Sequence, residues 1–539
     1  MKKLILTMVF ASLLLSCEDE KIDPMCGDSK INQESEECDR IDFENSCVDL
    51  GYYGGEIACT TSCTVNIDQC ILAGRCGDGS LQADHEECDG LEFAGVNGSN
   101  GDDCTSHGYG SGTVSCTEDC KFDLSECDSC GNEQLDLLTG EECDGIHLGD
   151  GTCYLEGMWG GELGCSSSCE YELENCTFAT NPITGEQHSC ILNDKGELLC
   201  LGKKLGGSTS DSKPEKIAFT ENVAQVVSGS AHVCFLDAVG DTWCLGEGAD
   251  YRLGTGDYQD QLAPVKINAP GQIFTKLSAG ASATCGINGA GELYCWGTLK
   301  RPLEDFFQNT TPQQITFDEG NVITKVSVGD VHMCVIDTDG AAFCWGNNSG
   351  GKLGNGQSGF FLTDSFTPVA VLQSEDYVDI AACQEHTCAI DINGDLWCWG
   401  KGSDYELGTG GTDDSAQPVL VDAPSGVEFV KVMCSISELR QTGYSGFTCA
   451  LSSVGDLYCW GDNYNKGRLG NNGAATFEPL PAMVHQSDFN LRWQDFYVGT
   501  NHVCAVDMDG RPWCWGDDTN KKCGGDAIGV YIAPVALMP

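Results

Sequence analysis

The chain has 539 residues, of which 82 are acidic and 28 basic, so its formal net charge is −54. Because a surface of this charge repels phosphates, the composition argues against nucleic acid as a partner. Thirty-six cysteines are too many for a reducing cytosol unless they bind metal, and their spacings are not those of zinc sites, so we expect an exported protein.

The N-terminus has the pattern of a bacterial lipoprotein signal peptide (residues 1–16). Two lysines precede an apolar run from Leu4 to Leu15, which is shorter than the roughly 20 residues that span a bilayer. The run ends in Leu14-Leu15-Ser16-Cys17, which resembles a lipobox, in which the Cys thiol is acylated after cleavage. We therefore expect lipid attachment at Cys17 and a tether over residues 17–25. Ordinary secretion, with Cys17 in a discarded peptide, is the alternative.

Three cysteine-rich modules follow, over residues 26–70, 76–127 and 130–176. Each has six cysteines, and the last three intervals between them are 12, 4 and 7 residues in every module. Modules this small bury too little apolar surface to fold alone, so we expect three disulfides in each, with fifteen pairings open. The spacing resembles the myxobacterial cysteine-rich repeat, which implies exposure outside the cytoplasm.

The second cysteine of each module lies in a Glu-Glu-Cys-Asp sequence, as in Glu86-Glu87-Cys88-Asp89. Clustered carboxylates are ligands that calcium prefers, so calcium in these modules stays an open alternative. Residues 18–176 carry 38 acidic and 5 basic residues, however, and we interpret most of these carboxylates as a solvated acidic surface. We assign no metal ligand and expect no cofactor.

From residue 178 to residue 539 a different repeat predicts an all-β, seven-bladed β-propeller. Two cysteines ten positions apart flank a Gly-centred turn, which predicts a β-hairpin with a cross-strand disulfide. The seven predicted pairs are Cys190 with Cys200, Cys234 with Cys244, Cys285 with Cys295, Cys334 with Cys344, Cys388 with Cys398, Cys449 with Cys459, and Cys504 with Cys514. An apolar strand precedes most hairpins and a Pro-led strand, suited to an outer edge, follows. We expect the C-terminal strand at Pro534 to complete the blade of the first hairpin and so close the ring.

The repeat units read His-x-Cys, then Cys-Trp-Gly, then Leu-Gly-x-Gly, as in His332-Met333-Cys334 and Leu353-Gly354-Asn355-Gly356. They resemble repeats of the regulator of chromosome condensation family. That resemblance implies the propeller fold. The units also depart from the pattern at several positions. Ala283 and Phe447 replace the His, Leu201 and Leu245 replace the Trp, and the third unit lacks Leu-Gly-x-Gly.

No motif of a catalytic site stands out, so we expect no catalytic residues. His188, His232, His332, His386 and His502 recur once per blade, which is typical of a structural hydrogen-bonding position. The Asp-x-Asp-Gly sequences are interpreted as hairpin turns rather than calcium loops, since they lack the other ligands. Cys383 and Cys434 occupy similar places in neighbouring units, which predicts a blade-to-blade disulfide. Cys523 is then left over, with a reactive thiol as the less favoured alternative.

Aromatic residues in the irregular loops are the predicted ligand contacts, since loops vary while the scaffold is constrained. They are Tyr251, Phe306, Phe307, Phe360, Phe361 and Tyr405. Packing beneath their own loops is the equally favoured alternative.

These patterns predict a lipid-anchored binding protein of the bacterial cell envelope, at the outer membrane, whose propeller loops contact a protein or glycan without catalysis. The membrane is contacted through the lipid anchor only, and both the cell surface and the periplasm stay open. Inhibition of an exported enzyme is one alternative, because a bacterial β-lactamase inhibitor uses a propeller of this family. A calcium-assisted glycan-processing enzyme is another, since two carboxylates at the required separation could lie in the central funnel.

Overall fold

The computed structural model describes residues 37–38, 46–95, 103–128, 130–132, 134–135, 141–149, 151–153, 158–267, 269, 271–299, 307–317, 320–359, 363–372, 375–436, 446–463, 467–473, 475–484, 491–524 and 529–537. The chain divides into two compact units, one within residues 1–149 and 164–172 and the other within residues 150–163 and 173–539. Among the described residues, no helix has the length and apolar character needed to cross a membrane.

The first unit consists of two-stranded antiparallel sheets and one short helix, α1 (Asp68–Ala73). The sheets are β1 (Ala58–Cys59) with β2 (Val65–Asn66), β3 (Cys88–Asp89) with β4 (Glu92–Phe93), β5 (Ser111–Gly112) with β8 (Cys127–Asp128), β6 (Ser115–Cys116) with β7 (Phe122–Asp123), and β10 (Gly164–Cys165) with β11 (Tyr171–Glu172). A 3-10 turn, η1 (Cys104–His107), precedes β5. Strands this short contribute little by themselves, so disulfides must hold the modules together.

The disulfides of the modules follow one connectivity, which the sequence left open. In all three modules the second cysteine is bonded to the fourth and the third to the sixth, and in the second and third modules the first is bonded to the fifth. The bonds are Cys76–Cys120, Cys88–Cys116 and Cys104–Cys127 in the second module, Cys130–Cys169, Cys143–Cys165 and Cys153–Cys176 in the third, and Cys38–Cys59 and Cys47–Cys70 among the described residues of the first.

The recurring carboxylates of the modules accept backbone hydrogen bonds. In each Glu-Glu-Cys-Asp sequence the second Glu accepts the N–H two residues after the fifth cysteine: Glu37 from Val65 (3.1 Å), Glu87 from Phe122 (3.0 Å) and Glu142 from Tyr171 (3.1 Å). Asp89 and Asp144 are buried and accept backbone N–H groups from the turn that opens their module. These carboxylates therefore have a structural role in the repeat.

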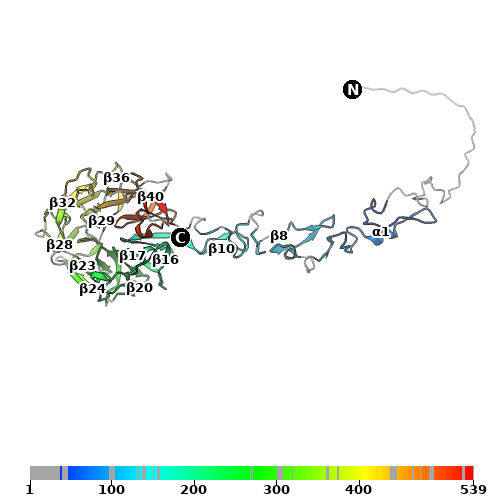
Figure 1. Ribbon diagram of the computed structural model, residues 1–539, viewed down its shortest axis with the longest axis horizontal. Helices are drawn as coiled ribbons and strands as arrows, with labels where there is room; N and C mark the ends of the chain where they lie inside the picture. Colours follow the sequence, from blue (N-terminus) through cyan, green and yellow to red (C-terminus); the bar gives the residue numbers. More distant parts are fainter. Residues whose placement is uncertain are drawn as a thin grey trace, which may run out of the picture. The chain divides into compact units, whose positions relative to one another are not determined.

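The second unit holds the propeller, whose seven sheets lie around a central axis (Figure 1). Each sheet has four antiparallel strands in sequence order, the first innermost. Blade 1 has β13 (Ala179–Thr184), β14 (His188–Asn193), β15 (Leu198–Lys203) and β16 (Ser210–Lys216), and blade 2 has β17 (Val223–Ser228), β18 (His232–Asp237), β19 (Thr242–Gly246) and β20 (Gln261–Lys266). Blade 3 has β21 (Phe274–Ala279), β22 (Ala283–Asn288), β23 (Leu293–Leu299) and β24 (Phe307–Ile315). Blade 4 has β25 (Ile323–Val328), β26 (His332–Asp337), β27 (Ala342–Gly346) and β28 (Ser365–Ala370).

Blades 5 to 7 follow the same order. They are β29 (Tyr377–Ala382), β30 (His386–Asp391), β31 (Leu396–Gly400), β32 (Ser415–Leu420); β33 (Phe429–Cys434), β34 (Phe447–Ser452), β35 (Leu457–Asp462), β36 (Phe477–Met483); and β37 (Trp493–Val498), β38 (His502–Asp507), β39 (Pro512–Asp517), β40 (Val530–Ala536). Three 3-10 turns, η2 (Ala249–Tyr251), η3 (Ser349–Gly351) and η4 (Thr519–Lys521), follow the third strands of blades 2, 4 and 7. The prediction of an all-β, seven-bladed propeller is confirmed.

Within every blade the two central strands place the paired cysteines directly opposite each other, with Cα atoms 4.0–4.1 Å apart. All seven pairs form disulfides, as the ten-residue spacing predicts. In blade order, Cys190 is bonded to Cys200, Cys234 to Cys244, Cys285 to Cys295, Cys334 to Cys344, Cys388 to Cys398, Cys449 to Cys459, and Cys504 to Cys514.

The hairpin turns between the paired cysteines are held by side-chain hydrogen bonds. An aspartate such as Asp337 accepts the backbone N–H groups of Asp339 and Ala341 through its carboxylate. The interpretation of the Asp-x-Asp-Gly sequences as hairpin turns is thereby confirmed.

The ring closes differently from the prediction. The C-terminal strand β40 pairs with β39 in the seventh blade, while the first blade is built from residues 179–216 alone. The expectation that the C-terminal strand completes the first blade was wrong. The innermost strand of that blade is β13, in which Pro182 and polar residues interrupt the apolar pattern of a strand. An innermost strand has one free edge, so it tolerates proline. The ring is closed by side-to-side packing, including a bond from Ala179 N–H to the Gly510 carbonyl (2.8 Å).

The third cysteine-rich module contributes to the second unit. Its strands β9 (Gly160–Gly161) and β12 (Cys176–Thr177) pair there, and Trp159, only 1% exposed, packs in an apolar cluster with Ala179 and Ile191. A buried tryptophan gives a large hydrophobic contact, so residues around β9 belong to the propeller's packed core.

Candidate binding surfaces of the propeller

The innermost strands surround a channel of about 390 Å³, and one strand position contributes a polar residue to its lining in every blade. It is the third residue of the strand in every blade: Asn181, Gln225, Lys276, Lys325, Asp379, Lys431 and Asp495. Sequence reasoning missed this ring, although the polar residue recurs at one position of every innermost strand.

The two carboxylates of the channel are engaged with neighbouring blades. Asp379 is ion-paired with Lys325 and accepts the Val432 N–H (2.9 Å). Asp495 lies 2.5 Å from Lys431 Nζ and accepts a hydrogen bond from Asn181 Nδ2 (2.9 Å). A glycosidase needs one protonated carboxyl and one free carboxylate. Asp379 and Asp495 instead connect blades.

The five repeated histidines form hydrogen bonds between blades. Nε2 lies 2.7–2.8 Å from a hydroxyl of the next blade in the pairs His188–Ser228, His232–Thr284, His332–Thr387, His386–Thr448 and His502–Ser189. Each hydroxyl also donates to a backbone carbonyl, so Nε2 is the donor. Burial lowers the pKa of all five imidazoles, to about 3 for His188 and His386, so they stay neutral.

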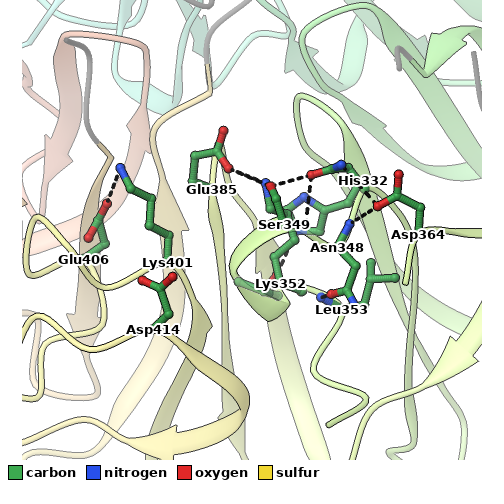
Figure 2. A network of polar contacts seen from close by, with 12 residues as sticks. His332, Asn348, Ser349, Lys352, Leu353, Asp364, Glu385, Lys401, Glu406 and Asp414 are labelled. Atoms are coloured by element: carbon green, nitrogen blue, oxygen red, sulfur yellow. Dashed lines mark hydrogen bonds and ion pairs between the residues drawn. The ribbon is translucent and has the colours of Figure 1, made fainter. Parts of the chain in front are cut away.

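On the face that carries the loops after the third strands, five blades have a buried charged residue before the Leu-Gly sequence, or before Cys523-Gly524 in blade 7. Four blades have a cation there, Arg252, Lys352, Arg468 and Lys522, none more than 2% exposed. In Figure 2 Lys352 reaches Glu385 of the next blade, with 2.5 Å between Nζ and Oε2. In three blades the backbone carbonyl of this position accepts the indole N–H of the next blade's Trp, as from Trp399 to Lys352 (2.9 Å). The loop face is therefore tied together by buried polar contacts.

The fifth blade has Glu406 at this position, an acid where the other four have cations. Its Oε2 accepts the Asp404 N–H (2.8 Å), and Lys401 Nζ lies 3.9 Å from Oε1 (Figure 2). Burial raises the pKa of Glu406 to about 7, against the opposing effects of two backbone hydrogen bonds and Lys401. Glu406 is thus a loop-face carboxyl whose pKa is raised to near neutrality.

Two of the predicted contact residues occupy a backbone position that favours glycine. The residue before each buried charge has a left-handed backbone, with glycine at Gly351 (φ 87°) and Gly467 (φ 63°). Tyr251 (φ 59°) and Tyr405 (φ 66°) adopt the same conformation, which costs a non-glycine residue about 1–2 kcal/mol. Tyr251 packs edge-on against Tyr258, and Tyr405 packs at a tilt against Phe477.

The remaining predicted site residues are placed as follows. Phe307 begins β24 and is half-buried. Cys17, Phe306, Phe360 and Phe361 lie outside the described residues. Cys383 and Cys434 form a disulfide between blades 5 and 6.

Cys523 occupies the leucine position of the last Leu-Gly sequence and is 2% exposed. Burial raises the pKa of its thiol, which favours a packing role. His386 with Cys383 and Cys434 brings three potential ligand atoms together, but both sulfurs are in the disulfide.

Comparison with known proteins adds the family. The profile of the RCC1-like domain matches residues 204–531, which is more than half of the chain. The chain belongs to the RCC1-like domain family. This agrees with the resemblance drawn from the repeat motifs, and the RCC1-like repeats of this chain carry the added disulfides described above.

Individual RCC1-like proteins are similar over part of this chain. The ultraviolet-B receptor UVR8 of Arabidopsis thaliana is 31% identical over 147 residues, covering 27% of this chain and 30% of that protein. The E3 ubiquitin-protein ligase HERC2 of Homo sapiens is 29% identical over 149 residues, which is 3% of its length. The matched part of the chain thus spans less than a third of either relative.

Solved structures share the fold. Prp20p of Saccharomyces cerevisiae superposes with a TM-score of 0.55 and 20% identity, covering 67% of this chain and 88% of that chain. Human WBSCR16 gives 0.53 and 16% identity, covering 62% and 86%. At this identity the likeness shows the propeller architecture alone.

Proposed function

We propose that this RCC1-like protein is a lipid-anchored, extracytoplasmic binding protein whose propeller loops bind a protein or glycan without catalysis. The many disulfides indicate an oxidising, extracytoplasmic environment. The lipid anchor at Cys17 is part of the proposal and rests on the lipobox-like sequence.

The observation that carries the binding function is the pair of loop tyrosines at glycine-type positions. Tyr251 and Tyr405 occupy left-handed backbone where two other blades have glycine. Each makes an aromatic contact with a partly or largely exposed ring, since Tyr258 is 64% and Phe477 is 37% exposed. A strained backbone that holds a half-exposed aromatic ring is typical of a contact site.

Absence of catalysis is supported by what the polar groups of the described residues do. The histidines and the hairpin aspartates have structural hydrogen bonds that recur in several blades, and the two channel aspartates connect neighbouring blades. Catalytic groups are more often singular than repeated.

The loop function is tested by the double variant Tyr251→Gly, Tyr405→Gly. Because glycine is compatible with this backbone, we expect the propeller to keep its stability within about 1 kcal/mol. Binding of the purified protein to arrayed glycans and to envelope proteins of the source cell should drop at least tenfold. Undiminished binding by a folded double variant would exclude the loop tyrosines as contacts.

The anchor and location have their own test. Cells that express the chain are labelled with a radioactive fatty acid, with Cys17→Ser as the control that loses the acceptor thiol. We expect label on the native chain only. Protease treatment of intact cells then separates a surface protein, whose propeller is removed, from a periplasmic one, whose propeller is protected.

A further inference from the structure

The boundary between blades 1 and 2 departs from the others in its packing. At four boundaries a tryptophan of one blade lies against the Leu-Gly glycine of the preceding blade, so close that an added Cβ would lie 2.5–2.7 Å from the ring. The pairs are Gly254–Trp296, Gly354–Trp399, Gly408–Trp460 and Gly470–Trp515. Around Trp399 the site is completed by Leu353, Val371 and Tyr377. Each of these boundaries thus contains a site built for an indole ring.

Between blades 1 and 2 the tryptophan ring is missing, and the side chains around its place are smaller. Leu245 stands at the tryptophan position, and Val223 stands where Tyr377 stands at the blade 4 boundary. The loop is also shorter, since Leu205 follows Cys200 by five residues whereas Leu353 follows Cys344 by nine. Gly206 now lies against backbone oxygens of Gly246 and Gln261 instead of a ring.

A pocket of about 420 Å³ occupies this boundary. Its apolar lining includes Leu201, Leu205, Ile217, Leu245, Leu262 and Pro264. Leu205 is 9% exposed, whereas the equivalent Leu353 is fully buried. An apolar cavity of about 150 Å³ is enough to hold benzene, so this pocket has room for a larger ring.

The boundary between blades 7 and 1 shows that a lost tryptophan alone does not open a pocket. Leu201 replaces the tryptophan there as well. An added Cβ on Gly524 would lie 2.8 Å from Leu537 and 3.6 Å from Leu201, and Leu537 is 1% exposed. These two leucines close the space. At the boundary between blades 1 and 2, Ile217 stands in the place of Leu537 and is only partly buried.

We propose that the pocket between blades 1 and 2 binds a planar, neutral aromatic ring of indole size, supplied by a ligand in the place that tryptophan fills elsewhere in this propeller. The lysines at the rim favour a neutral ligand because they are already paired with carboxylates. Lys203 pairs with Glu247 at 2.9 Å and Lys204 with Glu215 at 2.7 Å.

A polar group is also available for a ring N–H. At three of the four equivalent boundaries the carbonyl before the leucine accepts the indole N–H, at 2.9 Å for Lys352 and Glu406 and 3.1 Å for Arg468. The corresponding carbonyl here belongs to Lys204, a lining residue, and accepts one bond from Gly207 N–H. A carbonyl oxygen has two lone pairs, so it can accept a second bond. The pocket should therefore prefer indole to naphthalene.

The test is methyl NMR of the propeller during titration with indole and, separately, with N-acetyltryptophanamide. We expect saturable shifts of the Leu205, Ile217 and Leu245 methyl groups, with a Kd on the order of 0.1–1 mM for a ligand of about nine non-hydrogen atoms. Shifts with indole alone indicate a free small molecule as the natural source, and shifts with both indicate that a tryptophan side chain of a peptide also fits.

The decisive variant is Leu245→Trp, which restores the ring that four other boundaries contain. It should fold as the native chain does and weaken indole binding at least tenfold. The matched control is Leu420→Trp, which adds a tryptophan at an outer strand position that is 52% exposed and should leave binding unchanged. If Leu245→Trp fails to fold, Ile217→Phe narrows the pocket from its other wall. The proposal would be overturned if the methyl groups do not shift, or if the folded Leu245→Trp variant binds indole as tightly as the native chain does.

Discussion

The cysteine-rich modules and the propeller use disulfides in opposite ways. Among the described residues of the first unit, the buried hydrophobic residues are cysteines and Val114 alone. In the propeller each blade boundary has a cluster of aliphatic and aromatic side chains, such as the one around Trp399. In the modules the disulfides are the core, whereas in the propeller they join strands that are already packed.

The lengths of the closed loops fit this contrast. Cys88–Cys116 spans 28 residues and Cys334–Cys344 spans 10. In the chain-entropy model these contribute about 3–4 and about 2–3 kcal/mol, which is a small difference. What separates the two regions is therefore the apolar packing that remains when the bond is removed.

The largest expected effect comes from removing one disulfide in each region. Cys88→Ala with Cys116→Ala should unfold the second module, because no apolar core supports it. Cys334→Ala with Cys344→Ala should leave the propeller folded at a cost of about 2–3 kcal/mol. Hydrogen exchange read by mass spectrometry reports both regions in one sample. Retained protection in residues 76–127 of the first variant would show that the modules have stability beyond their disulfides.

The apolar boundaries are tested by Trp399→Ala, which we expect to cost about 3–5 kcal/mol. Trp399 is fully buried between blades 4 and 5 and donates its N–H to Lys352 O. Trp397→Ala in the same strand is the matched control, since that ring is only partly buried and should cost less. Denaturant unfolding of the reduced and oxidised proteins measures both. Equal losses would argue that the blade boundary is not the main source of stability.

A third test concerns the buried acid of the loop face. The pKa of Glu406 rises from 4.5 in the unfolded chain to about 7 in the fold, so the folded state binds the extra proton. Stability should accordingly fall as pH rises from about 4.5 to about 7, by up to about 3 kcal/mol. Glu406→Gln removes this titration and should be more stable than the native chain at pH 8 and no more stable at pH 4.

The control for this test is Glu385→Gln, because Glu385 is a partly exposed carboxylate that is ion-paired with the buried Lys352. Its removal should lower stability at pH 8 rather than raise it, since it leaves a buried cation unpaired. A Glu406→Gln variant with an unchanged pH profile would place the titrating group elsewhere.

The sequence predicted the features that repeat. Seven cysteine pairs at a fixed spacing determined the hairpins, and the recurring histidine predicted a structural role, because a regular scaffold imposes the same chemistry on each blade. The six-cysteine spacing predicted three modules but not their pairing, since every pairing satisfies the spacing equally.

Features that depend on contacts between distant residues were not predictable. The polar ring of the channel joins positions about 50 residues apart, and the strand β13 was missed because Pro182 interrupts its apolar pattern. The pocket between blades 1 and 2 needed both the sequence, which shows Leu245 at the tryptophan position, and the structure, in which no side chain of the described residues fills the space. At blades 7 and 1 the same substitution is compensated by Leu537.

The smallest expected effect tests the hydrogen bonds between blades. Where a blade has histidine before its first cysteine, the next blade offers a hydroxyl, as His332 meets Thr387 at 2.8 Å. Where the histidine is replaced by Phe447, the equivalent residue of the next blade is the buried Val503. The two positions thus form a polar pair at four boundaries and an apolar pair here, whereas between blades 1 and 2 Val233 stands at this position and His188 meets Ser228 of β17 instead.

Thr387→Val alone should cost about 1–2 kcal/mol, because it leaves the buried His332 N–H without its acceptor. Adding His332→Phe recreates the Phe447–Val503 combination and should recover part of that loss. A double-mutant cycle of unfolding free energies measures the coupling, which we expect to be at least about 0.5 kcal/mol. Additive losses would mean that the histidines act through packing rather than through the hydrogen bond, so that the loop face depends on the indole contacts alone.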